Sequence, residues 1–265
     1  MSEERKIYLK KIKREKNLAT FFKIFILIGF FAIWEVAAIT GIIDPFITSQ
    51  PSRIVTTIIN LYKQNSLWQH ILITAYETCM GFILGTILGT LIASLLWCFP
   101  FLCKVLEPYM VVLNSLPKIA LGPIFIVWIG SGPSAIIVIT LTISLIVCIM
   151  DVLGGFIATD KDQIKLIQTF GGNKLQTFTK VVLPSNLPVI VNALKISVGM
   201  SWVGSIVGEF LVSKEGLGYL IVYGSQVFKL DLVMASVLIL CIIATVMYYA
   251  VLQFEKLVLK SRRMN

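Results

Sequence analysis

The sequence has few charged side chains and lacks the patterns that carry catalysis. Charged residues make up 14% of the chain, against roughly 25% in soluble domains. The single histidine, His70, has no nucleophile or acid at motif spacing, and the five cysteines show no metal-ligand spacing. No G-x-x-x-x-G-K-[ST] phosphate loop occurs, so the chain is not expected to bind ATP itself. These absences predict a protein that is not an enzyme, with no catalytic residue, no metal site and no cofactor.

Hydrophobic residues are abundant instead, at 57% of 265 residues. They gather in six runs that are each long enough to cross a bilayer as a helix. The runs lie at about residues 21–43, 71–97, 110–129, 134–157, 187–212 and 232–254. The sequence therefore predicts an all-α polytopic membrane protein with six transmembrane helices. The expected parts are a basic tail (1–20), a transmembrane domain (21–258) and a second tail (259–265).

Basic residues are distributed unevenly between the two sides of these runs. Of the 23 lysines and arginines, 17 lie in the two end segments and in the loops on their side, and only 4 lie in the opposite loops. Because positive residues gather in cytoplasmic loops, both termini are expected in the cytoplasm. The net charge of +9 thus reflects membrane orientation, and no nucleic-acid partner is expected.

Two segments on the opposite side are too polar to cross. Within residues 44–68, a run from Pro51 has Ile54, Ile58, Ile59 and Tyr62 at helical spacing, which predicts an amphipathic helix on the external face. In residues 213–231, glycines alternate with apolar residues. This pattern favours a non-helical loop that dips back into the membrane.

The polar stretch at residues 160–188 separates the fourth run from the fifth. Its spacing predicts two short amphipathic helices hinged at Gly171-Gly172, because glycine ends helices readily in left-handed conformations. Leu183-Pro184 then predicts an extended break. Such a loop would present one apolar and one basic face to water, as expected of a docking element for a soluble protein.

Gly171, followed after nine residues by Val181-x-Leu183-Pro184, resembles the cytoplasmic loop motif of ABC importer permeases. That motif reads Glu-Ala-Ala, three residues, Gly, nine residues, Ile-x-Leu-Pro. Here Lys165-Leu166-Ile167 replaces Glu-Ala-Ala, and Val181 replaces Ile. Residues 66–82, 115–135 and 193–221 resemble the nitrate/sulfonate/taurine branch of the family, although that branch more often carries Arg where this chain has Glu77.

The resemblance implies a type I importer permease in the bacterial inner membrane. The implied partners are two ABC ATPase subunits, a second permease copy (a homodimer), an extracytoplasmic solute-binding protein and the lipid bilayer. The implied solute is a small anion such as a sulfonate, taurine or nitrate, with thiamine-precursor pyrimidines as an alternative. The residues implied in ATPase coupling are Lys165, Leu166, Ile167, Phe170, Gly171, Gly172, Leu183 and Pro184. Two other hypotheses remain: a secondary transporter driven by an ion gradient, and a membrane scaffold that does not transport.

Ionisable residues inside apolar runs are candidate site residues, because each is costly at membrane depth. Glu35, Glu77 and Asp151 are expected near helix ends. Lys195 could reach the cytoplasm, and Glu209 could serve an outer gate or pair with a lysine. Lys118 lies between prolines that should kink its helix, where it could contact an anion, pair with Asp151 or reach a carbonyl. The residues expected along a translocation path are Lys118, Ser201, Trp202, Ser205 and Glu209.

A strip of small residues follows one face of the second run. Gly81, Gly85, Gly89 and Ala93 recur every four residues, which predicts close packing against another helix. Movement of this strip against its neighbour during transport is a second interpretation.

Overall fold

The computed structural model describes residues 3–262, and every regular element among them is a helix. In chain order these are α1 (Glu3–Ile39), α2 (Pro45–Thr48), α3 (Pro51–Lys63), α4 (Leu67–Cys98), α5 (Pro100–Ser115), the 3-10 turn η1 (Lys118–Leu121), α6 (Gly122–Ile129), α7 (Pro133–Ile157), α8 (Lys161–Thr169), α9 (Lys174–Thr177), the π-helical turn η2 (Phe178–Val182), α10 (Leu183–Ser185), α11 (Leu187–Val212), α12 (Leu217–Gln226) and α13 (Leu230–Arg262). The all-α prediction is confirmed.

Within residues 3–262, five helices are long and apolar enough to cross a membrane: α1, α4, α7, α11 and α13. The bounds of α4, α7 and α11 follow the predicted runs closely, because the bilayer sets the length of an apolar run. From Glu3 onward, the segment expected as a separate basic tail continues into the first crossing as one helix. It is rich in good helix formers, and its first glycine is Gly29.

The expected third crossing is not one straight helix. Instead α5 begins at Pro100, and the pair formed by α5 and the segment Lys118–Ile129 is bent by 90°. Leu116 is extended before Pro117, which cannot continue the hydrogen-bond ladder. The kink beside Lys118 is therefore confirmed, and it breaks the run predicted at residues 110–129 into two arms. The bent pair accounts for a sixth crossing only if both arms are counted together.

The core of the protein is α7 packed between α4 and α11. Thr140 of α7 lies against Gly81 of α4 on one side and against Gly204 of α11 on the other. A Cβ added at Gly81 would overlap the Thr140 side chain, and one at Gly89 would lie 2.8 Å from the Cβ of Cys148. The α4 strip, which also includes Gly85, therefore brings two helix backbones together.

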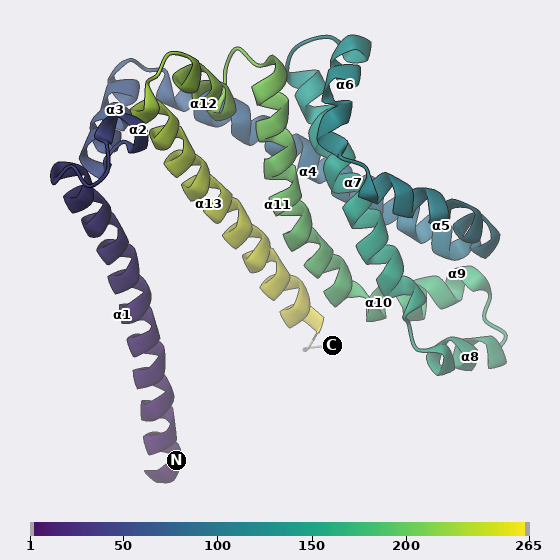
Figure 1. The fold of residues 1–265 in the computed structure, drawn as a ribbon. Helices are drawn as coiled ribbons and strands as arrows, with labels where there is room; N and C mark the ends of the chain where they lie inside the picture. The colour runs from purple at the N-terminus through teal and green to yellow at the C-terminus, as the bar shows by residue number, and fades with distance from the viewer. Residues whose placement is uncertain (1–2, 263–265) are drawn as a thin grey trace.

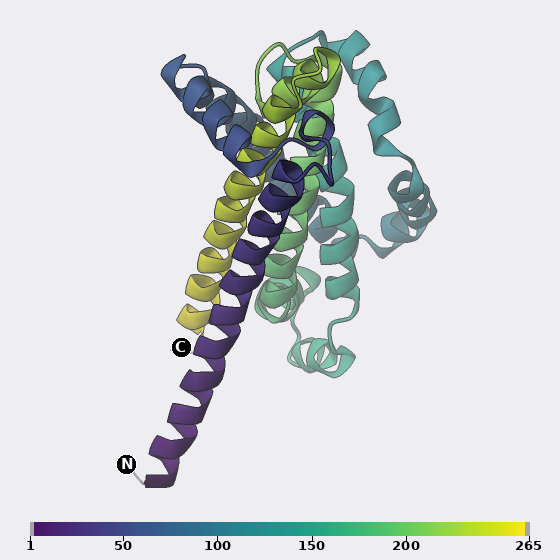
Figure 2. The same ribbon diagram turned by 60° about the vertical axis from the view of Figure 1, so that its left-hand side comes forward.

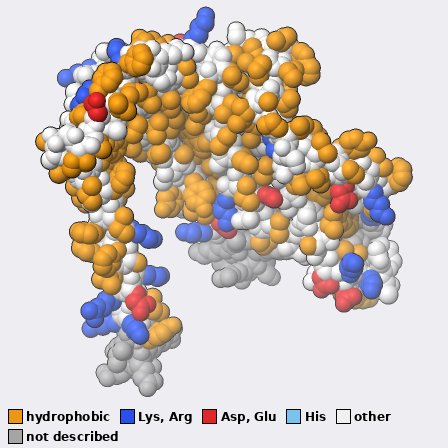
Figure 3. Space-filling view, in the orientation of Figure 1, with side chains coloured by type: hydrophobic (Ala, Val, Ile, Leu, Met, Phe, Trp, Pro, Cys, Tyr) orange, Lys and Arg blue, Asp and Glu red, His pale blue; other side chains and the backbone are white. Residues whose placement is uncertain are grey.

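The two ends of the molecule carry different elements (Figures 1 and 2). One end, here called the loop end, holds α8–α10 together with the start of α1 and the end of α13. The other end, the cap end, holds α2, α3 and α12. Apolar side chains cover much of the body between them, and charged side chains gather towards the loop end (Figure 3). The helix α1 stands apart from the core, with apolar side chains exposed along its length.

At the cap end, one prediction is confirmed and another is wrong. The amphipathic helix from Pro51 is α3, which buries Ile54 and joins α13 through an ion pair of Arg53 with Asp231 at 2.6 Å. Residues 213–231, expected as a non-helical loop, contain the helix α12. Its glycines permit close approach rather than irregular backbone: a Cβ at Gly224 would lie 2.9 Å from Cγ2 of Val233.

Candidate coupling surface and buried carboxyl site

The 160–188 segment begins with α8, which has defined caps at both ends. Asp160 accepts a hydrogen bond from the amide of Asp162 at 2.9 Å. At the other end, the amide of Gly171 donates to Gln168 O and the amide of Gly172 donates to Ile167 O, both at 2.9 Å. This pair of bonds is a Schellman motif, which requires a left-handed residue, and Gly171 has φ +78°.

The second glycine of the hinge has a different role from the first. A Cβ at Gly172 would lie 2.8 Å from the carbonyl oxygen of Ile167, whereas one at Gly171 would meet open space. Gly171 is therefore needed for its left-handed backbone conformation, and Gly172 is needed because a side chain there would clash with Ile167.

After the hinge the chain is helical through Ser185, so the expected extended break at Leu183-Pro184 was wrong. A capping box between Asn173 and Gln176 starts α9, and η2 and α10 follow without interruption. Leu183 has helical angles, φ −61° and ψ −48°. Pro184 is tolerated there because the π-helical turn before it widens the backbone.

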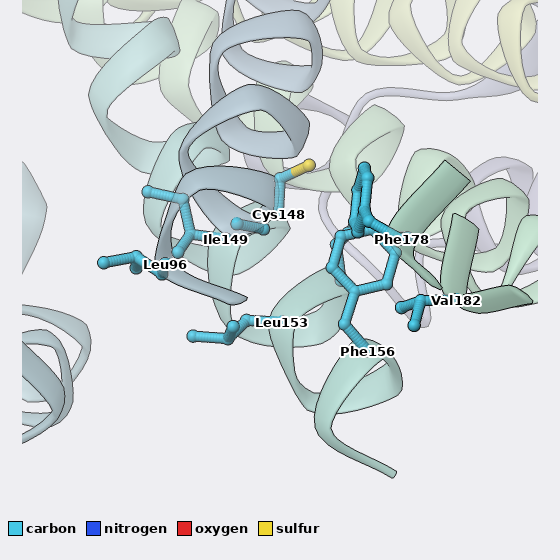
Figure 4. Close-up of a cluster of buried hydrophobic side chains, with 10 residues drawn as sticks. Leu96, Cys148, Ile149, Leu153, Phe156, Phe178 and Val182 are labelled. Atoms are coloured by element: carbon cyan, nitrogen blue, oxygen red, sulfur yellow. The ribbon is translucent and has the colours of Figure 1, made fainter. Parts of the chain in front are cut away.

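One face of the segment is anchored to the membrane helices. Phe178 and Val182 of η2 are buried in a cluster with Phe156 of α7 (Figure 4). The ring of Phe178 lies 5.4 Å from the ring of Phe156 and 5.4 Å from that of Trp97 of α4. The segment is thereby tied to both α4 and α7.

The other face carries unpartnered apolar side chains. Phe170 is 82% exposed, Leu175 is 65% exposed and Leu166 is 57% exposed. Lys165 beside them is also exposed, with Asp162 at 3.8 Å. The structure thus brings Lys165, Leu166 and Phe170 to one exposed region, while Ile167, Leu183 and Pro184 are half-buried.

At the cap end, side chains of α4 and α11 hold the start of α12. Glu209 Oε2 accepts from the amides of Gly218 at 2.6 Å and Tyr219 at 3.3 Å. The amide of Leu217 donates to Thr74 Oγ1 at 2.8 Å, and that of Gly216 donates to His70 Nδ1 at 2.9 Å. The free N–H groups of the first turn of α12 are therefore met by acceptors from two other helices.

Beside this cap lies a second buried carboxyl group. Glu77 is 1% exposed, and neither of its oxygens has a hydrogen-bond partner among the described residues. It lines a cavity of about 320 Å³ that the loops before α7 and before α12 complete. Glu77 lies in the third turn of α4, towards the end of that helix from which α12 is capped.

A chain with this arrangement of crossings and this anchored segment has clear relatives. Residues 81–263, more than half of the chain, match the family described as binding-protein-dependent transport system inner membrane component. The chain belongs to this family. It is 30% identical to a probable ABC transporter permease protein of Haemophilus influenzae, over 83% of this chain and 89% of that protein.

Two further relatives and a solved structure extend the comparison. The permease is 27% identical to the putative aliphatic sulfonates transport permease protein SsuC of Escherichia coli, over 81% of this chain and 82% of that one. It is 28% identical to the formylaminopyrimidine transport permease protein ThiX of Halalkalibacterium halodurans, over 87% and 92%. A chain of the MetNI methionine ABC transporter, solved facing inward, has a TM-score of 0.59 at 19% identity and covers 73% of this chain and 94% of that one. The predicted permease fold is confirmed, and ATP hydrolysis belongs to a separate subunit.

Four of the five residues expected along a translocation path lie on one helix, α11. Ser201, Trp202, Ser205 and Glu209 are buried in the packing of α11. Lys118 is instead half-buried at the bend between α5 and α6, where its Nζ donates to the carbonyl of Asn114 at 2.9 Å. Of the two protein contacts expected for Lys118, the carbonyl contact is formed, and no ion pair with Asp151 occurs among the described residues.

The other intramembrane charges also have defined surroundings. Lys195 donates to Glu255 Oε1 of α13 at 3.1 Å, an ion pair that the sequence did not indicate. Glu35 accepts from the amide of Ser52 at 3.0 Å and so caps α3. Sequence reasoning missed His70 and Thr74 as caps of α12. The two residues are four positions apart, on one face of α4, and this spacing was the available signal.

Substituting Glu209 tests the role of this cap in the permease. Glu209→Ala is expected to lower stability by about 1–3 kcal/mol, because two amides at a buried helix start lose their acceptor. Glu209→Gln retains an acceptor oxygen and should preserve most of that stability. The measurement is hydrogen exchange over residues 217–226, together with the apparent unfolding midpoint in detergent. The matched control is Glu215→Ala. The carboxylate of Glu215 is exposed and accepts a hydrogen bond from Gln69. If hydrogen exchange over residues 217–226 were equally fast in Glu209→Ala and Glu215→Ala, Glu209 would not be the cap of α12.

Proposed function

We propose that the permease forms part of a translocation path for a small solute and couples that path to separate ATPase subunits through its 160–188 segment. The complex would contain two permease copies, two ATPase subunits and an external solute-binding protein that docks at the cap end. The single observation that carries the proposal is the exposed apolar side chains of Leu166, Phe170 and Leu175 on an anchored segment. Exposed aromatic and aliphatic side chains on a rigid element are typical of protein interfaces.

The anchoring gives this proposal a mechanical route. A force on α8 passes to η2, and Phe178 is packed against both Phe156 of α7 and Trp97 of α4. Since α7 is pressed between α4 and α11, these three helices would tilt together when the ATPase subunits close. Packed helices of this kind move as rigid bodies between discrete arrangements.

In this proposal the loop end faces the cytoplasm of a bacterial inner membrane, with both termini on that side. The distribution of lysine and arginine supports this orientation. The orientation is also supported by Figure 1, where the start of α1, the end of α13 and α8 lie at one end of the molecule.

For the solute, we propose a small anion such as an alkanesulfonate, taurine or nitrate. The similarity to SsuC supports this, as does Lys118, which has no carboxylate oxygen within 4 Å among the described residues. A formylaminopyrimidine is the second candidate. The similarity to ThiX favours it, and the cap-end cavity presents Glu77, a group that accepts hydrogen bonds rather than binding anions. Uptake of labelled sulfonate, competed by unlabelled taurine, nitrate and formylaminopyrimidine, separates the two.

Substituting the hinge tests the coupling role. Gly171→Val should leave membrane insertion intact and lower ATP-driven uptake severalfold or more, because a β-branched residue resists the φ of +78° found there. Gly171→Asn is the matched control, since asparagine adopts left-handed conformations more readily. Uptake is measured with the ATPase rate in the same vesicles. Normal uptake by Gly171→Val would contradict the hinge. Uptake without ATPase subunits under an imposed ion gradient would instead favour a secondary transporter.

A further inference from the structure

A cavity of about 680 Å³ lies at the loop end, between the corner that joins α4 to α5 and the helices α8 and α9. Its volume falls within the roughly 300–1,000 Å³ of small-molecule sites. Much of its wall is apolar, with Leu96 and Trp97 from α4, Pro100 from α5 and Ile164 from α8. The cavity is therefore lined both by membrane helices and by the segment proposed to couple them.

The position of the cavity is at the ends of two membrane crossings. Its lining includes Trp97, one residue before the end of α4, and Ile157, the last residue of α7. Tryptophan is enriched where hydrocarbon gives way to headgroups. The cavity thus lies at the depth where a phospholipid changes from chain to headgroup.

The polar part of the wall is basic. Lys104 of α5 and Lys174 of α9 both line the cavity, and neither lies within 4 Å of a carboxylate oxygen in residues 3–262. Glu107 also lines it, so the lining retains an excess of one positive charge. Gln168 and Thr177 add hydrogen-bond donors. Two cations above an apolar wall fit an amphiphile with an anionic head.

We propose that this cavity binds one anionic phospholipid, with its phosphate between Lys104 and Lys174 and part of an acyl chain along Leu96, Trp97 and Ile164. Basic pockets beside membrane helices bind lipid headgroups in this way. A soluble anion would leave the apolar wall uncovered. A protein occupant is disfavoured because the exposed side chains of Phe170 and Leu175 do not line the cavity. The lipid would bridge α5 and α9, which places it between the bent crossing and the 160–188 segment.

Fluorescence quenching of Trp97 by brominated lipid tests this proposal without any transport measurement. A negative result would therefore count against lipid binding and leave the proposed transport function untouched. The full-length permease is placed in phosphatidylcholine bilayers with traces of brominated phosphatidylglycerol or brominated phosphatidylcholine. The Trp97 signal is the difference between the wild type and Trp97→Phe. Each lysine near a membrane surface should strengthen anionic-lipid binding about fivefold. The anionic lipid is therefore expected to quench Trp97 at a mole fraction at least about tenfold lower.

Paired lysine substitutions supply the control. Lys104→Gln with Lys174→Gln should abolish the preference for the anionic lipid. Lys161→Gln with Lys180→Gln, two lysines of the same segment outside the cavity lining, should retain it. If the first double variant does not fold, each single variant should show a preference reduced about fivefold. Equal quenching by both lipids, an unchanged preference in the cavity variants, or relief of quenching by inorganic phosphate would overturn the proposal.

Discussion

Replacing Gly204 with alanine is expected to lower the stability of the permease by about 3 kcal/mol, near the upper end of the usual range for overpacking. A Cβ at this position would lie 2.7 Å from the Cα of Thr140, which is backbone and cannot rotate away. Nor can α7 retreat, because Gly81 of α4 presses on Thr140 from the other side. The three central helices would have to separate along their length.

Gly199 on the same helix provides the matched control. It is exposed, and a Cβ added there would have no atom within 4 Å. Gly199→Ala should therefore have no destabilising effect, since alanine is the better helix former. The measurement is the apparent unfolding midpoint in detergent, with an expected drop of roughly 6–12 °C for Gly204→Ala alone. A similar drop in both variants would show that general glycine content, rather than the contact at Thr140, determines stability.

Replacing Phe170 with alanine is expected to weaken association with the ATPase subunits about thirtyfold, the effect of losing roughly 2 kcal/mol at an interface hot spot. The side chain is 82% exposed, so its removal takes almost no packing from the permease itself. Insertion and the unfolding midpoint should stay at wild-type values while ATP-driven uptake falls. Binding is measured between the detergent-solubilised permease and its ATPase partner.

Phe25→Ala is the control for this loss. Phe25 is 61% exposed on α1, within a membrane crossing, and should contact lipid rather than the ATPase. Its substitution should leave ATPase association unchanged. Equal weakening by both substitutions would mean that the effect arises from general loss of apolar surface.

Helices whose length is dictated by the bilayer could be predicted from the sequence. The runs expected at residues 134–157 and 187–212 correspond to α7 and α11 almost residue for residue. Hydropathy could not show the right angle between α5 and α6, because a bent segment and a straight one have the same average composition. The prolines beside Lys118 indicated a break, and only the three-dimensional arrangement gave its size.

The cap-end site was beyond sequence reasoning for a different physical reason. Glu209 has its role because the amides of Gly218 and Tyr219 point at it, and that requires α12 to be a helix. The glycines of that segment were interpreted as loop residues, although Gly218 is needed for close approach: a Cβ there would lie 2.8 Å from Glu209 Oε2. A contact between distant segments thus determined the local structure.

In the 160–188 segment, local signals succeeded at the hinge and failed at Pro184. Gly171 adopts the left-handed conformation that a glycine after a short helix predicts. The helical backbone at Leu183 depends on the preceding π-helical turn and on burial of Val182 against α7, neither of which neighbouring residues reveal.

The most direct test of the coupling surface is a cross-link from its exposed face to the ATPase subunit. Leu175 is replaced by cysteine in a permease whose five native cysteines have been changed to serine or alanine, and a short thiol-to-amine reagent is applied to the assembled complex. Because Leu175 is 65% exposed on the unanchored face of the segment, we predict a permease–ATPase product whose yield changes on ATP binding. The absence of that product, with the thiol accessible only to reagents added outside the cell, would contradict the account.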